Sequence, residues 1–168
     1  QSWMALPDGE EECEAAFQHY PAADIPQTSV GDVSVRVIIG EAYGHTSPVH
    51  AYSSTLYLEL MMPAGAELRL PDQYEEIGAY VVSGSVTIDD QAYGEGAMAI
   101  GGPGAAMTLT AGEDSRVMVI GGESLGKRHI YWNFVSSTRE RIEQAKADWR
   151  EGRFGEVPGE TEFIPLPE

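Results

Sequence analysis

Short β-type runs dominate the middle of the chain. Between residues 32 and 121 they recur about every eight to twelve residues, separated by Gly, Pro and Asp and by no helical pattern. In the run 55–62, Leu56, Leu58 and Leu60 fall on one face of a strand, and Tyr57 and Glu59 on the other. A parallel sheet would need interleaved helices, so the sequence predicts an all-β fold, an antiparallel jelly-roll β-barrel. The expected strands are residues 33–39, 55–62, 66–70, 77–82, 85–88, 97–100, 105–110 and 115–120.

The N-terminal segment differs in amino-acid composition. Residues 1–31 are acidic and are interrupted by Pro7, Pro21 and Pro26. Prolines block both helix continuation and sheet ladders, so this segment is predicted to be an extended arm.

The C-terminal segment contains the one convincing helical pattern. Residues 32–168 are predicted to be a single domain whose helix spans 137–151. Ser137 would cap its N-terminus, and Ile142 and Trp149 would be buried on its apolar stripe.

The charge of the chain limits its partners. There are 27 acidic and 10 basic residues, a net charge of -17. Such a surface repels phosphate backbones and anionic lipids, so neither nucleic acids nor membranes are expected partners. No apolar run approaches the roughly 18 residues that suggest a membrane span, and the N-terminus lacks signal-peptide features. With Cys13 as the only cysteine, no internal disulfide can form, and a cytoplasmic location is expected.

Catalytic motifs of several other kinds are missing from the sequence. Residues 101–104 lack the Lys and Ser/Thr of a phosphate-binding loop. Cys13 lies among glutamates, whose negative charges disfavour a reactive thiolate. Asp89 and Asp90 fit a hairpin turn better than an acid/base pair.

The C-terminal region carries the residues of a known family. The stretches 132–137, 140–146 and 148–149, and the tail from Val157 to Pro167, closely resemble the end of bacterial pirins. Upstream, residues 47–49 and the glycine pair 121–122 fit the same family. The chain is therefore identified as a member of the pirin family, within its C-terminal half.

This resemblance implies two cupin barrels in tandem, the first holding an iron-type metal with three histidines and a glutamate. Residues 1–31 would be the arm between the barrels, and residues 32–168 the metal-free C-terminal cupin domain. The metal-bearing barrel would precede Gln1, and the missing initiator Met fits a fragment or a processed chain. The family is linked to quercetin dioxygenation and to regulatory protein contacts.

The spacing of the cupin metal-ligand motif can be aligned with this chain by using its glycines as reference positions. With Gly84 closing the first motif, the glutamate place falls on Ile77 and the two histidine places fall within residues 70–73, which hold no histidine. In the second motif the last histidine place falls on Met107. A lone thioether does not hold Fe(II). We therefore expect no catalytic, cofactor-binding or metal-binding residue here, with Ile77 and Met107 as core side chains.

The four histidines are weaker candidates. His45 and His50 flank a loop and could form an adventitious surface zinc site with a nearby glutamate. A pair on a strand and a loop more often points in two directions. His19 and His129 are expected on the surface, and the basic cluster 127–129 is expected to form a salt bridge with the acidic surface.

Three functions fit these observations. The first is a structural or regulatory half-protein that supports the N-terminal cupin of the same protein or contacts a regulatory protein. The second is part of an iron-dependent quercetin 2,3-dioxygenase, and the third is a barrel that binds a small aromatic ligand. The chain alone is expected to catalyse nothing and to hold no cofactor, with Fe(II) or a similar metal in the N-terminal cupin. Uncovered apolar surface could be relieved in two ways: the N-terminal arm, with Trp3, Phe17, Tyr20 and Ile25, could fold over it, or two copies could pair. A homodimer, or an arm exchanged between copies, is expected.

Overall fold

The computed structural model describes residues 2–155 and 158–167. Gln1 and Val157, which belong to the opening and tail motifs, lie outside the described residues. The chain forms two compact units, which are treated separately. The barrel unit is Ala15–Ser124, and the helical unit combines Gln1–Glu14 with Leu125–Glu168.

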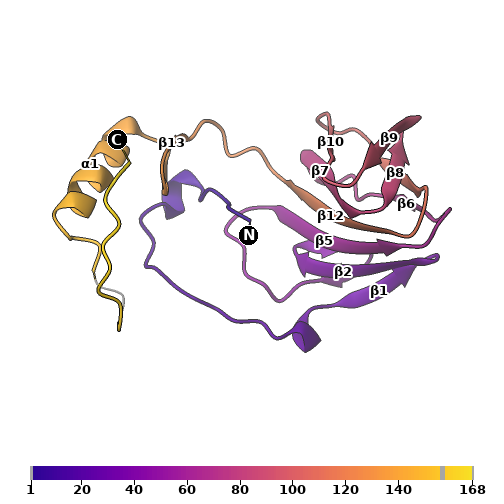
Figure 1. Cartoon of the computed structure of the whole chain (residues 1–168), viewed down its shortest axis with the longest axis horizontal. Helices are drawn as coiled ribbons and strands as arrows, with labels where there is room; N and C mark the ends of the chain where they lie inside the picture. Colours follow the sequence, from indigo (N-terminus) through magenta and orange to yellow (C-terminus); the bar gives the residue numbers. More distant parts are fainter. Residues whose placement is uncertain (1, 156–157, 168) are drawn as a thin grey trace. The chain divides into compact units, whose positions relative to one another are not determined.

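The barrel unit consists mainly of two antiparallel sheets (Figure 1). The larger has the order β1 (Gln27–Val30), β2 (Val33–Ile39), β5 (Thr55–Met62), β12 (Ser115–Gly122), β7 (Glu76–Ser83) and β10 (Met98–Gly101). The smaller has the order β6 (Glu67–Arg69), β11 (Thr108–Ala111), β8 (Ser85–Ile88) and β9 (Gln91–Gly94). A short hairpin, β3 (Glu41–Ala42) and β4 (His45–Thr46), and a 3-10 turn, η2 (Ala22–Asp24), complete the unit. The predicted all-β cupin fold with one C-terminal helix is confirmed.

The barrel core follows from strict alternation along the central strands. Leu56, Leu58 and Leu60 of β5 are buried, and so are Val117 and Val119 of the neighbouring β12. Burial of such side chains stabilises a fold by about 1.5–3 kcal/mol each. The intervening residues face outward, so each strand of the larger sheet has an inner and an outer face.

Two turns in the barrel need unusual backbone angles. Gly84, between β7 and β8, has φ +81°, and a Cβ atom there would lie 2.6 Å from the carbonyl oxygen of Asp114. Only glycine meets both conditions without strain. Asp89 and Asp90 join β8 to β9 with φ of 48° and 63°, the two positive values of a tight hairpin turn.

The helical unit contains β13 (His129–Tyr131), β14 (Phe134–Ser136), α1 (Arg139–Arg150) and a 3-10 turn, η1 (Asp8–Glu10). Thr138 caps α1 by accepting a hydrogen bond from the backbone N–H of Arg141. The prediction of Ser137 as the cap was wrong: its hydroxyl donates to Glu11, and Thr138 holds the capping position. The helix accordingly starts two residues later than predicted.

Burial on α1 agrees only partly with the predicted stripe. Ile142 and Ala145 are buried, as their spacing of three residues predicts for one helix face. Trp149, which was expected to be buried, is half-buried, and its indole N–H donates to the carbonyl oxygen of Ile164 at 2.8 Å. Within the described residues, no helix is long and apolar enough to cross a membrane.

Candidate functional site

The residues predicted to stand at the cupin ligand positions lie together inside the barrel, and they are apolar. Ile77 pairs with Gly101 across β7 and β10, and the backbone N–H of Leu70 donates to the carbonyl oxygen of Met107. A Cβ atom on Gly101 would lie 2.7 Å from Sδ of Met107 and 3.2 Å from Cγ2 of Ile77. Leu70, Ile77 and Met107 are all at most 5% exposed. The barrel therefore brings the predicted ligand positions together, and aliphatic side chains and one thioether occupy them.

The remaining residues of the first ligand place point elsewhere. Asp72 forms an exposed ion pair with Arg69 at 2.8 Å. The side-chain amide of Gln73 donates to the carbonyl oxygen of Glu41. Fe(II) in cupins needs converging imidazole and carboxylate ligands, and these residues do not supply them. The donor set in this barrel does not fit an iron centre.

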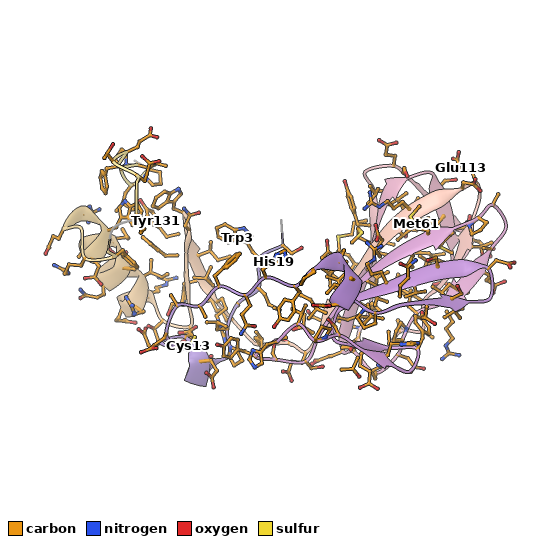
Figure 2. All side chains as sticks on the ribbon, turned by 90° about the horizontal axis from the view of Figure 1, so that it is seen from below. Trp3, Cys13, His19, Met61, Glu113 and Tyr131 are labelled. Carbon is orange, nitrogen blue, oxygen red and sulfur yellow. The ribbon has the colours of Figure 1, made fainter. Side chains whose placement is uncertain are left out.

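The two histidine candidates, His45 and His50, lie on different segments of the barrel unit. His45 lies on β4, while His50 lies in the following loop with its ring edge against Tyr52, at a centroid distance of 4.8 Å. Among residues 2–155 and 158–167, no group of three His, Cys, Asp or Glu side chains could hold a metal ion. Cys13 and His19 are exposed on segments outside the strands (Figure 2). The adventitious zinc site at His45 and His50 stays a hypothesis.

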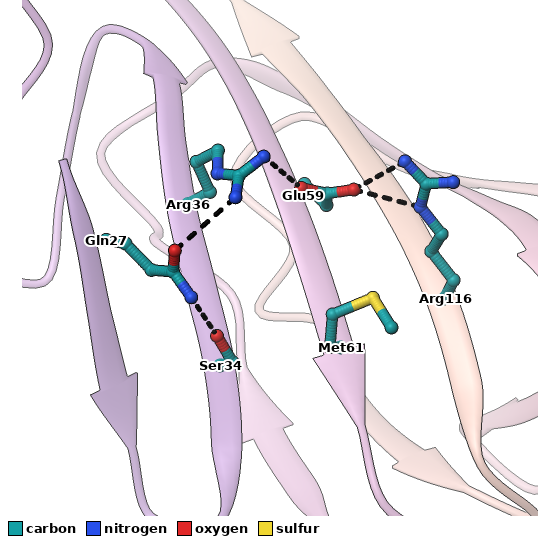
Figure 3. A pocket seen from close by; sticks show the side chains of 6 residues that line it. All are labelled: Gln27, Ser34, Arg36, Glu59, Met61 and Arg116. Atoms are coloured by element: carbon teal, nitrogen blue, oxygen red, sulfur yellow. Dashed lines mark hydrogen bonds and ion pairs between the residues drawn. The ribbon is translucent and has the colours of Figure 1, made fainter. Parts of the chain in front are cut away.

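A polar groove on the outer face of the larger sheet was not predicted. Figure 3 shows Glu59 of β5 between Arg36 of β2 and Arg116 of β12. Its carboxylate accepts from Arg36 at 3.1 Å and from Nε of Arg116 at 2.9 Å. Gln27, Ser34 and Met61 complete a groove of about 290 Å³. Arg36 and Glu59 are direct neighbours in the register of β2 and β5, which strand alternation alone could not reveal.

A second charged cluster ties the two ends of the helical unit together. The guanidinium of Arg128 contacts Asp8 at 2.7 Å and donates to the carbonyl oxygen of Leu6. Glu11 accepts from the backbone N–H of Ser137 at 2.7 Å and from the hydroxyls of Ser136 and Ser137. The expected pairing of the basic cluster 127–129 with acidic residues is thus realised at Arg128.

The electrostatics of Glu11 follow from these contacts. Burial raises the pKa of this carboxyl group, but the hydrogen bonds from Ser137 and Ser136 and the charge of Arg128 lower it further than burial raises it. The pKa of Glu11 therefore lies below the ordinary value of 4.5. Hydrogen bonds to the ionised form have this effect generally. The cluster is suited to holding two chain segments together rather than to proton transfer.

Residues from both units match a known domain. A model of the pirin C-terminal cupin domain matches residues 57–155. The chain belongs to the pirin family. Among its relatives, a pirin-like protein from Caulobacter vibrioides is 43% identical over 171 residues, which cover 100% of this chain and 59% of that protein. Human pirin is 32% identical over 164 residues, covering 92% of this chain and 56% of that protein.

Solved structures share the fold of this chain. A crystal structure of quercetin 2,3-dioxygenase from Acinetobacter baumannii superposes with a TM-score of 0.88 at 26% identity, covering 99% of this chain and 57% of that one. GK1651 from Geobacillus kaustophilus shares the fold, with a TM-score of 0.65 at 22% identity, over 74% of this chain and 53% of that one. The chain thus spans somewhat more than half the length of these relatives. It is the C-terminal cupin half of a pirin-like protein.

Proposed function

We propose that this chain is a non-catalytic half that supports a metal-bearing cupin barrel of the same protein, with a structural or regulatory role. The observation that carries the proposal is the packing of Ile77 and Met107 against Gly101, at the positions that motif spacing predicts for cupin metal ligands. A barrel filled in this way contributes shape and surface rather than open coordination positions. A regulatory protein partner and a cytoplasmic location stay predictions.

The composition of the helical unit also supports this role. In the part of this unit that the structure describes, only Ser136, Ile142 and Ala145 are buried. Seven of its large apolar side chains are exposed: Trp3, Met4, Ile130, Val135, Phe154, Phe163 and Ile164. So small a core contributes little stability, and exposed apolar surface on this scale favours packing against another domain. A neighbouring cupin barrel would supply that surface.

Metal content and oxygen consumption test the proposal. We expect the purified chain, prepared without an affinity tag, to bind no stoichiometric iron and to consume no oxygen with quercetin after Fe(II) is added. The reason is that no ligand set holds iron with open positions for dioxygen. Stoichiometric iron inside the barrel, or turnover that survives removal of trace metal enzymes, would contradict it. Substoichiometric zinc that is lost in a His45→Ala, His50→Ala double variant would not contradict the proposal.

A second candidate is that the whole protein is a quercetin 2,3-dioxygenase of which this chain is a part. Relatives from Pseudomonas aeruginosa carry the name putative quercetin 2,3-dioxygenase, at 28% and 30% identity. Activity of the longer protein that disappears with its metal-bearing barrel would favour this candidate. A barrel that binds a small aromatic ligand is the third candidate, and flavonol binding by the isolated chain would favour it.

A further inference from the structure

The C-terminal tail of the chain carries a proline pattern that constrains its backbone. Residues 164–167 have the sequence Ile-Pro-Leu-Pro. Each proline ring holds its own φ at about −65°, and the residue before a proline is pushed out of the helical region. These residues therefore favour the left-handed polyproline II conformation. In agreement, the structure has neither helix nor strand between residues 160 and 167.

Two aromatic side chains of the helical unit donate hydrogen bonds to this tail, which runs beside α1 (Figure 1). The indole N–H of Trp149, on α1, donates to the carbonyl oxygen of Ile164 at 2.8 Å. The hydroxyl of Tyr131, on β13, donates to the carbonyl oxygen of Pro167 at 2.8 Å. A polyproline II helix has three residues per turn, so carbonyl groups three residues apart point to the same side. The two donors therefore contact one side of the tail, one helical turn apart.

The side chains of the tail follow the same period of three. The ring of Phe163 stacks on Trp149 at a centroid distance of 5.7 Å and an interplanar angle of 25°. Leu166, three residues later, is half-buried, whereas the other residues from 161 to 167 are exposed. Ile164, which lies between Phe163 and Leu166, is 58% exposed. The side of the tail that carries Phe163 and Leu166 is thus the side that contacts the helical unit.

The two donors belong to an aromatic platform, formed by Tyr131, Trp132, Phe134 and Trp149. Trp132 contacts Trp149 with ring centroids 5.2 Å apart, and it contacts Phe134 at 5.8 Å. Trp132 lies in the two-residue turn between β13 and β14 and has φ +52°. A bulky residue rarely adopts this left-handed conformation, and such strain persists only where surrounding contacts hold it. The packing of Trp132 against Trp149 is such a contact, and it joins the hairpin to α1 without the tail.

We propose that the aromatic platform is a binding site for proline-rich peptides, and that the chain's own tail occupies it as an exchangeable ligand. Aromatic side chains that line a groove are a general means of recognising polyproline II segments. The partner that fits this site is a peptide with the pattern Phe-x-Pro-Leu-Pro, as in the tail. Its carbonyl groups accept from Trp149 and Tyr131, and its Phe and Leu side chains pack where Phe163 and Leu166 do.

The tail is held at the surface, which permits exchange. Phe163 and Ile164 are each 58% exposed, and both hydrogen bonds to the tail form at exposed positions. A tethered segment competes with free peptide at an effective concentration on the order of millimolar. A free peptide of the same sequence therefore binds weakly while the tail is in place, and binds more tightly once the tail is weakened or removed.

Fluorescence anisotropy of a labelled peptide, residues 160–168 of the chain, tests the proposal. In the whole chain, Phe163→Ala combined with Leu166→Ala weakens the resident tail without shortening the protein. We expect this opened variant to bind the peptide about tenfold more tightly than the wild-type chain does. A chain that ends at Gly159 should do the same. Circular dichroism checks that both variants are folded.

Changes in the peptide test the period of three. Peptides with Phe163→Ala or Leu166→Ala should bind the opened variant about fivefold more weakly, because each loses a side chain that packs on the platform. The Ile164→Ala peptide is the matched control. It keeps the carbonyl group that accepts from Trp149 and loses only an exposed side chain, so it should bind like the original peptide.

Changes in the platform test the two donors. Trp149→Phe and Tyr131→Phe, each made in the opened variant, remove one hydrogen-bond donor and keep an aromatic ring. Each should weaken peptide binding about fivefold. Tyr80→Phe, which removes a hydroxyl from an exposed side chain of the barrel unit, is the control and should change nothing.

Three results would overturn the proposal. The first is that the peptide binds neither the folded opened variant nor the folded chain that ends at Gly159. The second is that it binds the wild-type chain as tightly as the opened variant. The third is that its binding is unchanged in both Trp149→Phe and Tyr131→Phe.

Discussion

The Glu11 carboxylate connects the N-terminal and C-terminal segments of the helical unit through its hydrogen bonds. Its pKa in the folded chain is lowered, so its ionised form stabilises the fold above pH 4.5 and this contribution is lost as the pH falls through the lowered pKa. All three tryptophans, Trp3, Trp132 and Trp149, belong to this unit. We expect their fluorescence to report loosening of the unit below about pH 4.5.

The matching variant is Glu11→Gln, which removes the ionisable group but keeps its size. Its helical unit should already be loosened at pH 7 and should change less with acidification than wild type. Glu67→Gln, on an exposed position of β6, is the control and should titrate like wild type. A pH profile identical in wild type and Glu11→Gln would show that this carboxylate does not hold the two segments.

Gly101 is a second residue whose role can be tested. Its added Cβ atom would contact Met107 and Ile77 in the filled interior. Gly101→Ala should lower the free energy of unfolding by about 1–3 kcal/mol through overpacking, as measured by urea denaturation. Gly94→Ala is the control, because nothing lies within 4 Å of its added Cβ atom. Equal effects in both variants would mean that the side chains around Gly101 can shift to accommodate the added methyl group.

At the scale of single residues, the sequence could predict positions that follow a motif with fixed spacing. It could not predict contacts between residues far apart in the chain. Motif spacing predicted degenerate ligand positions at Ile77 and Met107, and both side chains lie near Gly101. The contact of Glu11 with Ser136 joins residues 125 positions apart. No local pattern encodes such a pairing, so it was not predicted.

At the scale of elements, the hairpin between β8 and β9 offers a stabilising change. Asp90 has φ +63° in a two-residue turn, a conformation that glycine adopts without the steric cost of a Cβ atom. Relief of about 1–3 kcal/mol of left-handed strain exceeds the about 0.5–1 kcal/mol entropic cost of glycine, so Asp90→Gly should raise the free energy of unfolding in urea denaturation. Asp32→Gly is the control, in a turn where the residue has no positive φ, and should be neutral or destabilising. A loss of stability in Asp90→Gly would show that the aspartate side chain stabilises this turn.

The long strands were predicted better than the short ones. The expected run 55–62 matches β5, and 33–39 matches β2, because buried alternation over seven or eight residues is a strong signal. The edge strands β1 and β9, of four residues each, were missed. Their burial patterns are mostly exposed or intermediate, so hydrophobic alternation cannot mark them, and pairing with a neighbour defines them instead.

At the scale of the whole molecule, the sequence predicted the barrel but not the division into two units. The helical unit combines residues 1–14 with residues 125–168, and Arg128, Glu11 and Arg141 make the contacts between these segments. Local composition does not reveal a compact unit that combines the two ends of the chain, because it carries no information about contacts between distant segments. The role of residues 1–31 as an arm between two barrels stays a prediction.

The two units should unfold in separate steps. The barrel unit has a large core of Val and Leu side chains, whereas the described part of the helical unit buries only Ser136, Ile142 and Ala145. Stability follows buried apolar area, and local unfolding follows low contact density. Because all three tryptophans lie in the helical unit, their fluorescence follows that unit, while circular dichroism near 218 nm follows mainly the strands. We expect the fluorescence transition in urea to have the lower midpoint. Phe17→Ala, which truncates a side chain of the barrel unit that is 90% exposed, should shift neither transition. Coincident transitions by both probes would show that the units unfold as one cooperative body.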